Sequence, residues 1–236
     1  MWLFRSGDDG LSPIIVYQYH PTRNSDAAVK FFAGSKPSTY INVDGYAGYN
    51  KLKDFKRCCC YAHIRRYFME AISKGKETDY TDLAVQGFLY CNKLFEYERS
   101  YLSYKQIYNR RLKDQKPVVE AFLAWINKQN APNGSRLTRA LTYARNQQSY
   151  MMTYLEDGHC SISNNMSENA IRPVSVGRRN WLFCDSTDGA DASMMVYSLL
   201  ETARANGLNP QKYLEYLLEA RPNESMSDEE LENMAP

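Results

Sequence analysis

The periodicity of apolar residues changes part-way along the chain. The first sixty residues hold short stretches of aromatic and β-branched residues separated by turn residues, whereas residues 79–157 follow a long helical pattern rich in Tyr and Leu. Alternation over four or five residues predicts strands, and apolar residues three and four positions apart predict helices. The chain is therefore expected to have a mixed α/β (α+β) fold interrupted by a large helical insertion.

Turn and capping residues place the expected elements. Strands are predicted at residues 1–5, 13–19, 40–43 and 58–61, the first two joined by a Gly- and Asp-rich hairpin turn. Helices are predicted at residues 24–34, 62–72, 192–205 and 209–220, and a further helical stretch after residue 164 is interrupted at Pro173. The residues after 222 are expected to fray.

These patterns divide the chain into five expected parts. They are a first core part at 1–78, the helical insertion at 79–157, a completion of the core at 158–205, a C-terminal segment at 206–221 and a flexible acidic tail at 222–236. The net charge of the whole chain is +2. The acidic tail offsets the charge of the residues before it, which are moderately basic. A basic body is compatible with a polyanionic partner.

Composition excludes several classes of protein. With 44% hydrophobic and 24% charged residues, the chain resembles ordinary globular proteins rather than disordered or fibrous ones. Its apolar runs are far shorter than the roughly 18 residues of a membrane span. Charged residues follow the apolar start too soon for a signal peptide. We therefore expect a cytoplasmic protein with no membrane partner.

Six cysteines raise the question of disulfides or a zinc site. Three of them are consecutive, Cys58 to Cys60, and the chain is long enough to fold without disulfide bonds. Both observations favour reduced thiols. Cys60 and His63 have the spacing of half a zinc site, but Cys91, Cys160 and Cys184 are isolated. Because no second pair has finger spacing, we expect no zinc.

Two acidic residues are candidates for metal chemistry. Asp44 follows the strand predicted at 40–43, and Glu168 lies in the helical stretch after residue 164. Carboxylates from separate elements can converge on Mg²⁺, which prefers oxygen ligands and retains waters. From spacing alone, the favoured explanation is that both are ordinary acids at the ends of elements, because structural acids far outnumber ligands.

A resemblance to a known family changes that balance. The segments that carry it are, in order, 40–50 (YINVDGYAGYN), 60–68 (CYAHIRRYF), 164–173 (NNMSENAIRP), 177–183 (GRRNWLF), 197–203 (YSLLETA) and 206–210 (NGLNP). In order and spacing they resemble the catalytic region and the short C-terminal segment of the insertion sequence 66 family of DDE transposases. The similarity runs over nearly the whole chain.

The resemblance implies a ribonuclease H-like fold whose Asp, Asp, Glu triad binds two divalent metals and cuts and joins DNA. Asp44 resembles the second Asp and Glu168 the Glu, whereas the first Asp has no counterpart. We expect an N-terminally truncated transposase whose mixed sheet lacks its first, central strand. The flanking strands would close up, or another chain would supply the strand, or the product would fold poorly. With an incomplete triad, Mg²⁺ (or Mn²⁺) is expected to bind weakly, and strand transfer by the chain alone to be poor.

The same motifs suggest residues that contact DNA. Candidates for phosphate contacts or base stacking are Arg65, Arg66, Arg172, Arg178, Arg179 and Trp181. Arg172, four residues after Glu168, is expected to share its helix face. His63 and Asn165 are possible neighbours of the active site, although a core histidine and a helix cap explain them equally well. The paired arginines also fit a solvated surface, and Trp181 also fits a core.

Three functions remain open at this level. The first is a fragment of a DNA-cutting and joining enzyme, acting on transposon ends and target DNA as a homo-oligomer or together with full-length transposase. The second is a non-catalytic DNA-binding or regulatory derivative, which the missing Asp favours. The third, a helical scaffold unrelated to DNA, leaves the ordered motifs unexplained. A salt titration of DNA binding separates the second from the third, because phosphate contacts weaken steeply as salt rises.

Overall fold

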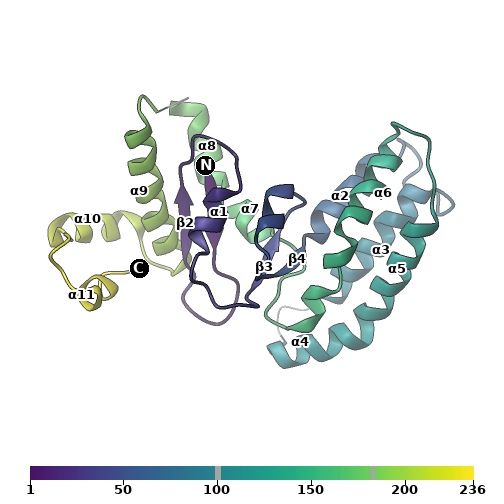
Figure 1. Ribbon diagram of the computed structural model, residues 1–236, viewed down its shortest axis with the longest axis horizontal. Helices are drawn as coiled ribbons and strands as arrows, with labels where there is room; N and C mark the ends of the chain where they lie inside the picture. The colour runs from purple at the N-terminus through teal and green to yellow at the C-terminus, as the bar shows by residue number, and fades with distance from the viewer. Residues whose placement is uncertain (99–101, 182–183) are drawn as a thin grey trace. The chain divides into compact units, whose positions relative to one another are not determined.

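The computed structural model describes residues 1–98, 102–181 and 184–236, and the chain folds into two compact units (Figure 1). The first unit comprises Met1–Ala27 and Met166–Pro236, and the second comprises Ala28–Asn165. Helices and short strands occur together, so the predicted mixed α/β fold is confirmed. The described strands form two sheets of two strands each, and the ribonuclease H-like arrangement remains a prediction.

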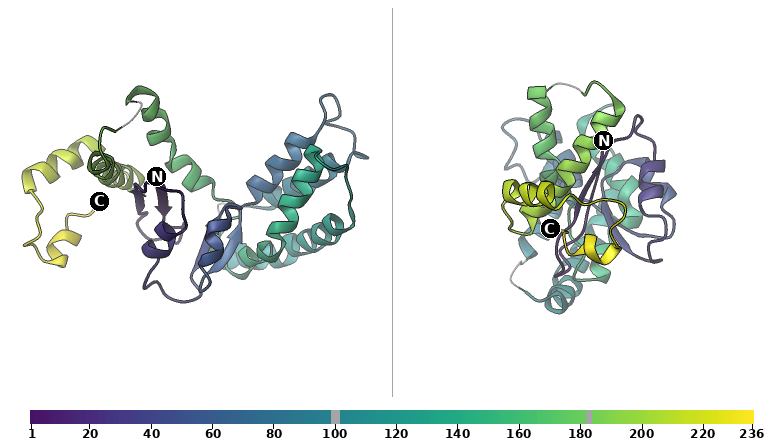
Figure 2. Two further views of the ribbon diagram at one scale, coloured as in Figure 1. Left: turned by 45° about the horizontal axis from the view of Figure 1, so that its top comes forward. Right: turned by 90° about the vertical axis from the view of Figure 1, so that its left-hand side faces the viewer.

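The first unit is built on the predicted hairpin. Strand β1 (Trp2–Arg5) pairs antiparallel with β2 (Ile15–Gln18), with Leu3 opposite Tyr17. The helices of this unit are α7 (Asn165–Ala170), α8 (Arg172–Trp181), α9 (Thr187–Ala205), α10 (Pro210–Ala220) and α11 (Asp228–Glu232), whereas α1 (Asp26–Phe31) begins at the end of this unit and continues in the second. Of these, α9 packs along β2 (Figure 2). Together they bury a small core of Ile15, Tyr17, Ala170, Val174 and Met194.

Three sequence-based expectations in this region need correction. The helical pattern does break near Pro173, but α8 begins at once, with Pro173 as its second residue. Proline is tolerated in a first helical turn because the amide there has no intrahelical acceptor. Helix α9 begins at Thr187 rather than 192, because the Ser186 side chain caps it by accepting from Gly189 N–H. The tail forms α11, where Ser227 and Glu230 make a reciprocal capping box.

The second unit combines a parallel strand pair with α-helices. Strand β3 (Tyr40–Val43) pairs parallel with β4 (Lys56–Cys59), which begins two residues before its predicted start. The α-helices that follow α1 are α2 (Tyr61–Ala71), α3 (Leu83–Tyr97), α4 (Tyr104–Arg110), α5 (Lys116–Lys128) and α6 (Arg136–Gln147). The helices within residues 83–147, α3 to α6, are called the helical block. Shorter turns are η1 (Ala47–Lys51), the π-helical η2 (Arg111–Gln115), η3 (Gln148–Tyr150) and η4 (Thr153–Glu156).

The core of the second unit lies between α2 and the helical block. Tyr61, Ile64 and Phe68 form the buried face of α2, which packs against both α3 and α6 (Figure 1). Phe122 and Ile126 bring α5 into the same cluster. The helical block shares one core with the strand pair, because Cys58 and Cys59 of β4 belong to the same cluster.

Two expectations about composition can be compared with the structure. All six cysteines carry free thiols, as expected, and five of them are buried. Burial raises the pKa of the Cys59 and Cys91 thiols, which favours the neutral form. Within the described ranges, none of the helices has the length and apolar character needed to cross a membrane.

Candidate functional site

Asp44 lies immediately after β3, at the carboxyl end of the parallel strand pair. Its Oδ1 accepts a hydrogen bond from Tyr46 N–H at 2.9 Å, so the carboxylate begins an Asx turn. Its second oxygen, Oδ2, accepts no hydrogen bond within the described part of the chain. The side chain is half-buried. One carboxylate oxygen thus orders the turn, and the other remains available to a ligand.

The turn after Asp44 is held by the helical block. The Gly45 N–H donates to the hydroxyl of Tyr143, in α6, at 3.1 Å. A Cβ at position 45 would lie only 2.5 Å from Cε2 of that ring, so a residue without a side chain is needed there. The Tyr143 ring is itself stacked on Tyr67 of α2 with centroids 4.3 Å apart. Burial raises the pKa of the Tyr143 phenol, which therefore stays protonated at neutral pH.

Arg57 of β4 holds the same turn from its other side. The guanidinium is buried and donates to Asn50 Oδ1 at 2.8 Å, to the Asp44 carbonyl at 2.9 Å and to Gln147 Oε1 at 3.4 Å. It also lies 4.4 Å from the ring centroid of Tyr150. All three acceptors are neutral, and within the described ranges Arg57 forms no ion pair. The turn is thus linked to η1, α6 and η3 through one side chain.

Glu168 lies in the first turn of α7 and is half-buried. Ile171 N–H donates to Ser167 O and Ser175 N–H donates to Ile171 O, so helical hydrogen bonds continue across the break between α7 and α8. Arg172 is the exposed first residue of α8. That Arg172 and Glu168 share one face therefore remains a prediction.

The other predicted site residues lie on α2, α7 and α8. Arg65 is half-buried, with its guanidinium 5.0 Å from the Phe88 ring centroid and 5.6 Å from that of Phe95. Its neighbour Arg66 is exposed, and His63 is half-buried near the start of α2. Three further positions follow in order: Asn165 is the exposed first residue of α7, Arg178 and Arg179 are exposed in the last turn of α8, and the side chain of Trp181 lies outside the described residues.

The structure fits a divalent cation at Asp44 only in part. A hard cation needs several oxygen ligands, and Asp44 offers one oxygen that is not committed to the turn. Among the described residues, no group of three or more His, Cys, Asp or Glu side chains is placed to hold a metal. Asp44 belongs to the second unit and Glu168 to the first. The arrangement of the units therefore decides the distance between these two carboxyl groups.

Comparison with known proteins identifies the family. Residues 1–192 match the family described as "Transposase IS66 family", and residues 198–236 match the one described as "IS66 C-terminal element". The chain belongs to the IS66 transposase family. This confirms the resemblance seen in the motifs around Asp44 and Glu168.

Curated relatives of this IS66-family chain come from Sinorhizobium fredii. The uncharacterized protein y4qI is 27% identical over 236 residues, which cover 92% of this chain and 43% of y4qI. The uncharacterized protein y4hP is 26% identical over 221 residues, which cover 86% of this chain and 40% of y4hP. The chain thus spans less than half the length of these relatives. No solved structure matches it.

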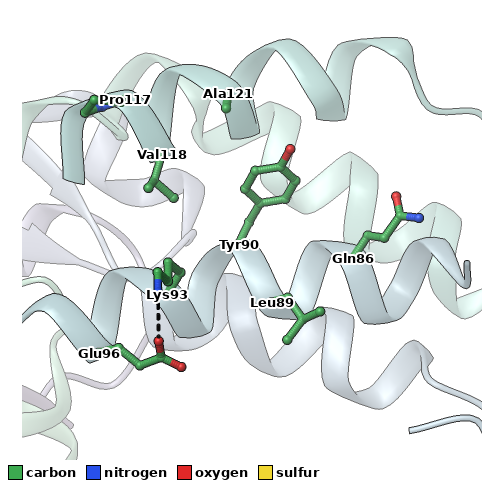
Figure 3. Close-up of a pocket in the computed structure, with 8 residues that line it drawn as sticks. All are labelled: Gln86, Leu89, Tyr90, Lys93, Glu96, Pro117, Val118 and Ala121. Carbon is green, nitrogen blue, oxygen red and sulfur yellow. Dashed lines mark hydrogen bonds and ion pairs between the residues drawn. The ribbon is translucent and has the colours of Figure 1, made fainter. Parts of the chain in front are cut away.

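The helical block also carries an open hollow of about 690 Å³ between α3 and α5 (Figure 3). Its lining is mainly apolar and comprises Gln86, Leu89, Tyr90, Lys93, Glu96, Pro117, Val118 and Ala121. Lys93 and Glu96 form an ion pair at 3.5 Å at one end of the hollow. None of the residues that resemble the transposase motifs lines it, so we assign it no part in DNA chemistry.

Sequence reasoning missed the residues that surround the Asp44 turn. The helical pattern around Tyr143 indicates packing alone, yet its hydroxyl contacts the turn directly. Arg57 and Gln147 lie outside the segments that resemble the family motifs. The one local signal was an arginine at the start of a buried strand, which needs buried acceptors; which acceptors it finds is not visible in the local pattern.

Proposed function

We propose that this chain is the catalytic region of an insertion-sequence transposase that cuts and joins DNA by two-metal phosphoryl transfer. The observation that carries the proposal is the family match over residues 1–192, supported by Asp44 at the carboxyl end of β3. Asp44 and Glu168 are proposed as ligands of Mg²⁺ or Mn²⁺ in a ribonuclease H-like arrangement. Bound metal ions would activate the attacking oxygen and stabilise the leaving oxygen.

The residues of the chain have separate tasks in this proposal. Asp44 contributes Oδ2 to the metal while Oδ1 stays in its turn. The exposed arginines Arg66, Arg172, Arg178 and Arg179 contact DNA phosphates, which supplies affinity without sequence selection. Arg65 packs on two aromatic rings and contributes charge from a half-buried position. With only Asp44 and Glu168 proposed as carboxylate ligands, we expect weak metal binding and poor strand transfer by the chain alone.

A salt titration tests whether DNA is the substrate. Fluorescence anisotropy with a labelled DNA duplex should show affinity falling steeply between 50 and 200 mM salt, because bound cations are released from the phosphates. Arg178→Glu should weaken binding at every sequence tested and reduce the slope of log affinity against log salt by about 1. The matched control is Lys212→Glu, an exposed charge on α10 of the same unit, which should leave the slope unchanged.

Two outcomes would contradict the proposal in different ways. If affinity did not depend on salt, or if Arg178→Glu and Lys212→Glu behaved alike, the assigned DNA surface would be wrong. Efficient Mg²⁺-dependent joining of transposon ends by the isolated chain would instead show that the set of catalytic residues is more complete than proposed. DNA binding that is unaffected by Asp44→Asn, without any metal-dependent chemistry, would favour a non-catalytic DNA-binding role.

A further inference from the structure

The turn that contains Asp44 is held in place by side chains from β4 and α6. Besides the internal bond from Tyr46 N–H to the Asp44 carboxylate, Gly45 N–H donates to the Tyr143 hydroxyl, and Arg57 donates both to the Asp44 carbonyl and to Gln147 Oε1. Tyr143 and Gln147 both belong to α6, in the helical block, and lie about a hundred residues beyond the turn. Residues 28–165 form one compact unit, so these contacts lie within a single body.

We infer that the helical block positions Asp44, with Tyr143, Arg57 and Gln147 as positioning residues for its carboxylate. This inference rests on the proposed metal-binding function. The helical block thereby contributes to metal binding, because it fixes the orientation of the Asp44 carboxylate before any ligand binds.

The contact with Tyr143 fixes the backbone next to Asp44. The Gly45 N–H is directed at the phenol oxygen, and the ring lies where a Cβ of residue 45 would be. Because Tyr143 is stacked on Tyr67 of α2, the ring cannot swing away without disturbing the packing of α6 on α2. The amide at position 45 is therefore held against a rigid surface.

The contact with Arg57 fixes the other side of the turn. Arg57 lies on β4 directly beside Ile41 of β3, so the backbone that carries its guanidinium is anchored in the sheet. Its planar fork reaches the Asp44 carbonyl and Asn50 with separate nitrogens, which a lysine could not reproduce. The backbone on both sides of the Asp44 side chain is thus fixed, at the Gly45 amide by α6 and at the Asp44 carbonyl by the sheet.

Preorganisation of this kind matters for metal binding. A carboxylate that must be ordered at the moment of binding loses affinity in proportion to the fraction of time it spends in other orientations. Ligand residues are commonly held by the groups behind them, and loss of such a group typically weakens metal binding about tenfold or more. Tyr143 and Arg57 are supporting groups of this kind, because they hold the backbone of the turn that contains Asp44.

The test uses the full chain, Mn²⁺ as the probe and two independent readouts. Hydrogen exchange of the Gly45 amide, measured by NMR, reports the order of the turn. Mn²⁺ affinity, measured by electron paramagnetic resonance, reports the carboxylate. Tyr143→Phe keeps the ring and removes the acceptor, so Gly45 should exchange about fivefold to tenfold faster, and Mn²⁺ should bind about threefold to tenfold more weakly. Arg57→Met should have a similar effect that Arg57→Lys rescues only in part.

Tyr154→Phe is the matched control. Its hydroxyl donates to Gln115 at 2.6 Å in the same unit, away from the turn, so its loss should lower the unfolding midpoint but leave Gly45 exchange and Mn²⁺ affinity as in the wild type. The inference is overturned if Tyr143→Phe leaves either readout at the wild-type value, or if Tyr154→Phe changes both equally. Asp44→Asn separates this result from the metal proposal: if it binds Mn²⁺ as well as the wild type, the proposed ligand is wrong, while Gly45 exchange still reports the contact with Tyr143.

Discussion

At the scale of single residues, one buried ion pair organises the end of α3. Arg111, in the π-helical turn, donates through Nε and Nη2 to the two carboxylate oxygens of Glu98, both at 3.0 Å. It also donates to the carbonyls of Tyr154 and Asp157. Gln115 donates to Glu98 and accepts from the Tyr154 hydroxyl. The network joins α3, η2 and η4, and the charge of Arg111 is balanced by the Glu98 carboxylate.

Removing one partner of this pair should be costly. Glu98→Ala leaves the guanidinium of Arg111, whose side chain is 3% exposed, without its carboxylate. A buried charge left unpaired typically destabilises a protein by about 3–5 kcal/mol. Urea unfolding should therefore show a large fall in midpoint.

Glu96→Ala is the control for this substitution. Glu96 pairs with Lys93 at the surface, and such pairs contribute about 0–1 kcal/mol. Equal midpoints for Glu98→Ala and Glu96→Ala would show that the buried network does not stabilise the fold.

At the scale of elements, α9 completes the open edge of the hairpin with side chains. The hydroxyl of Thr202 accepts from Ile15 N–H at 3.0 Å and donates to Ile15 O at 2.9 Å. The hydroxyl of Ser198 accepts from Tyr17 N–H at 2.8 Å. The two hydroxyls lie one helical turn apart and match alternate residues of β2. An edge that would otherwise be open to another strand is thereby closed.

Removing these hydroxyls should weaken the first unit. Thr202→Val keeps the shape of the side chain but leaves the buried amide and carbonyl of Ile15 without partners, which costs about 1–3 kcal/mol for each group. We expect a lower thermal midpoint and faster exchange of the Ile15 amide.

Ser193→Ala serves as the control on the same helix. The Ser193 hydroxyl is exposed and donates only to Gly189 O of α9 itself, so its loss should change stability by less than about 0.5 kcal/mol. Wild-type exchange at Ile15 in Thr202→Val would show that α9 does not complete the edge.

At the scale of the whole molecule, each unit has its own buried cluster. Ile15, Tyr17 and Met194 belong to the cluster of the first unit, and Phe68 and Phe122 belong to that of the second. Domains with separate cores can open independently. The chain crosses between the units twice, after Ala27 and after Asn165.

Independent opening leads to a prediction for hydrogen exchange. Phe122→Ala removes a fully buried ring from the second unit and should destabilise that unit by about 3–5 kcal/mol. Exchange measured by mass spectrometry under native conditions should rise in α2, α3, α5 and α6 and stay at wild-type values in β2 and α9. An equal rise in both units would show that they unfold as one.

Much of the local structure follows from the sequence. Strand β3 was predicted with its observed bounds, and the hairpin was predicted within three residues, because alternation over a few positions is a local property. The family, and the positions of Asp44 and Glu168 within its motifs, could also be predicted, because the order and spacing of motifs are visible in the sequence itself. Helix α8 departs from the prediction because Pro173, which the pattern places at an interruption of the helix, stands in the first turn of a new one.

Local sequence patterns are enough to identify the family, most of the helices and strands, and the acidic residues proposed for the chemistry. Tertiary structure decided what surrounds them: Tyr143 reaches Gly45 across 98 positions, and Thr202 reaches Ile15 across 187. Periodicity is set by neighbours within one or two turns, whereas these contacts depend on which faces the folded chain brings together. A tyrosine in a helical pattern gives no local sign that its hydroxyl will hold a distant turn.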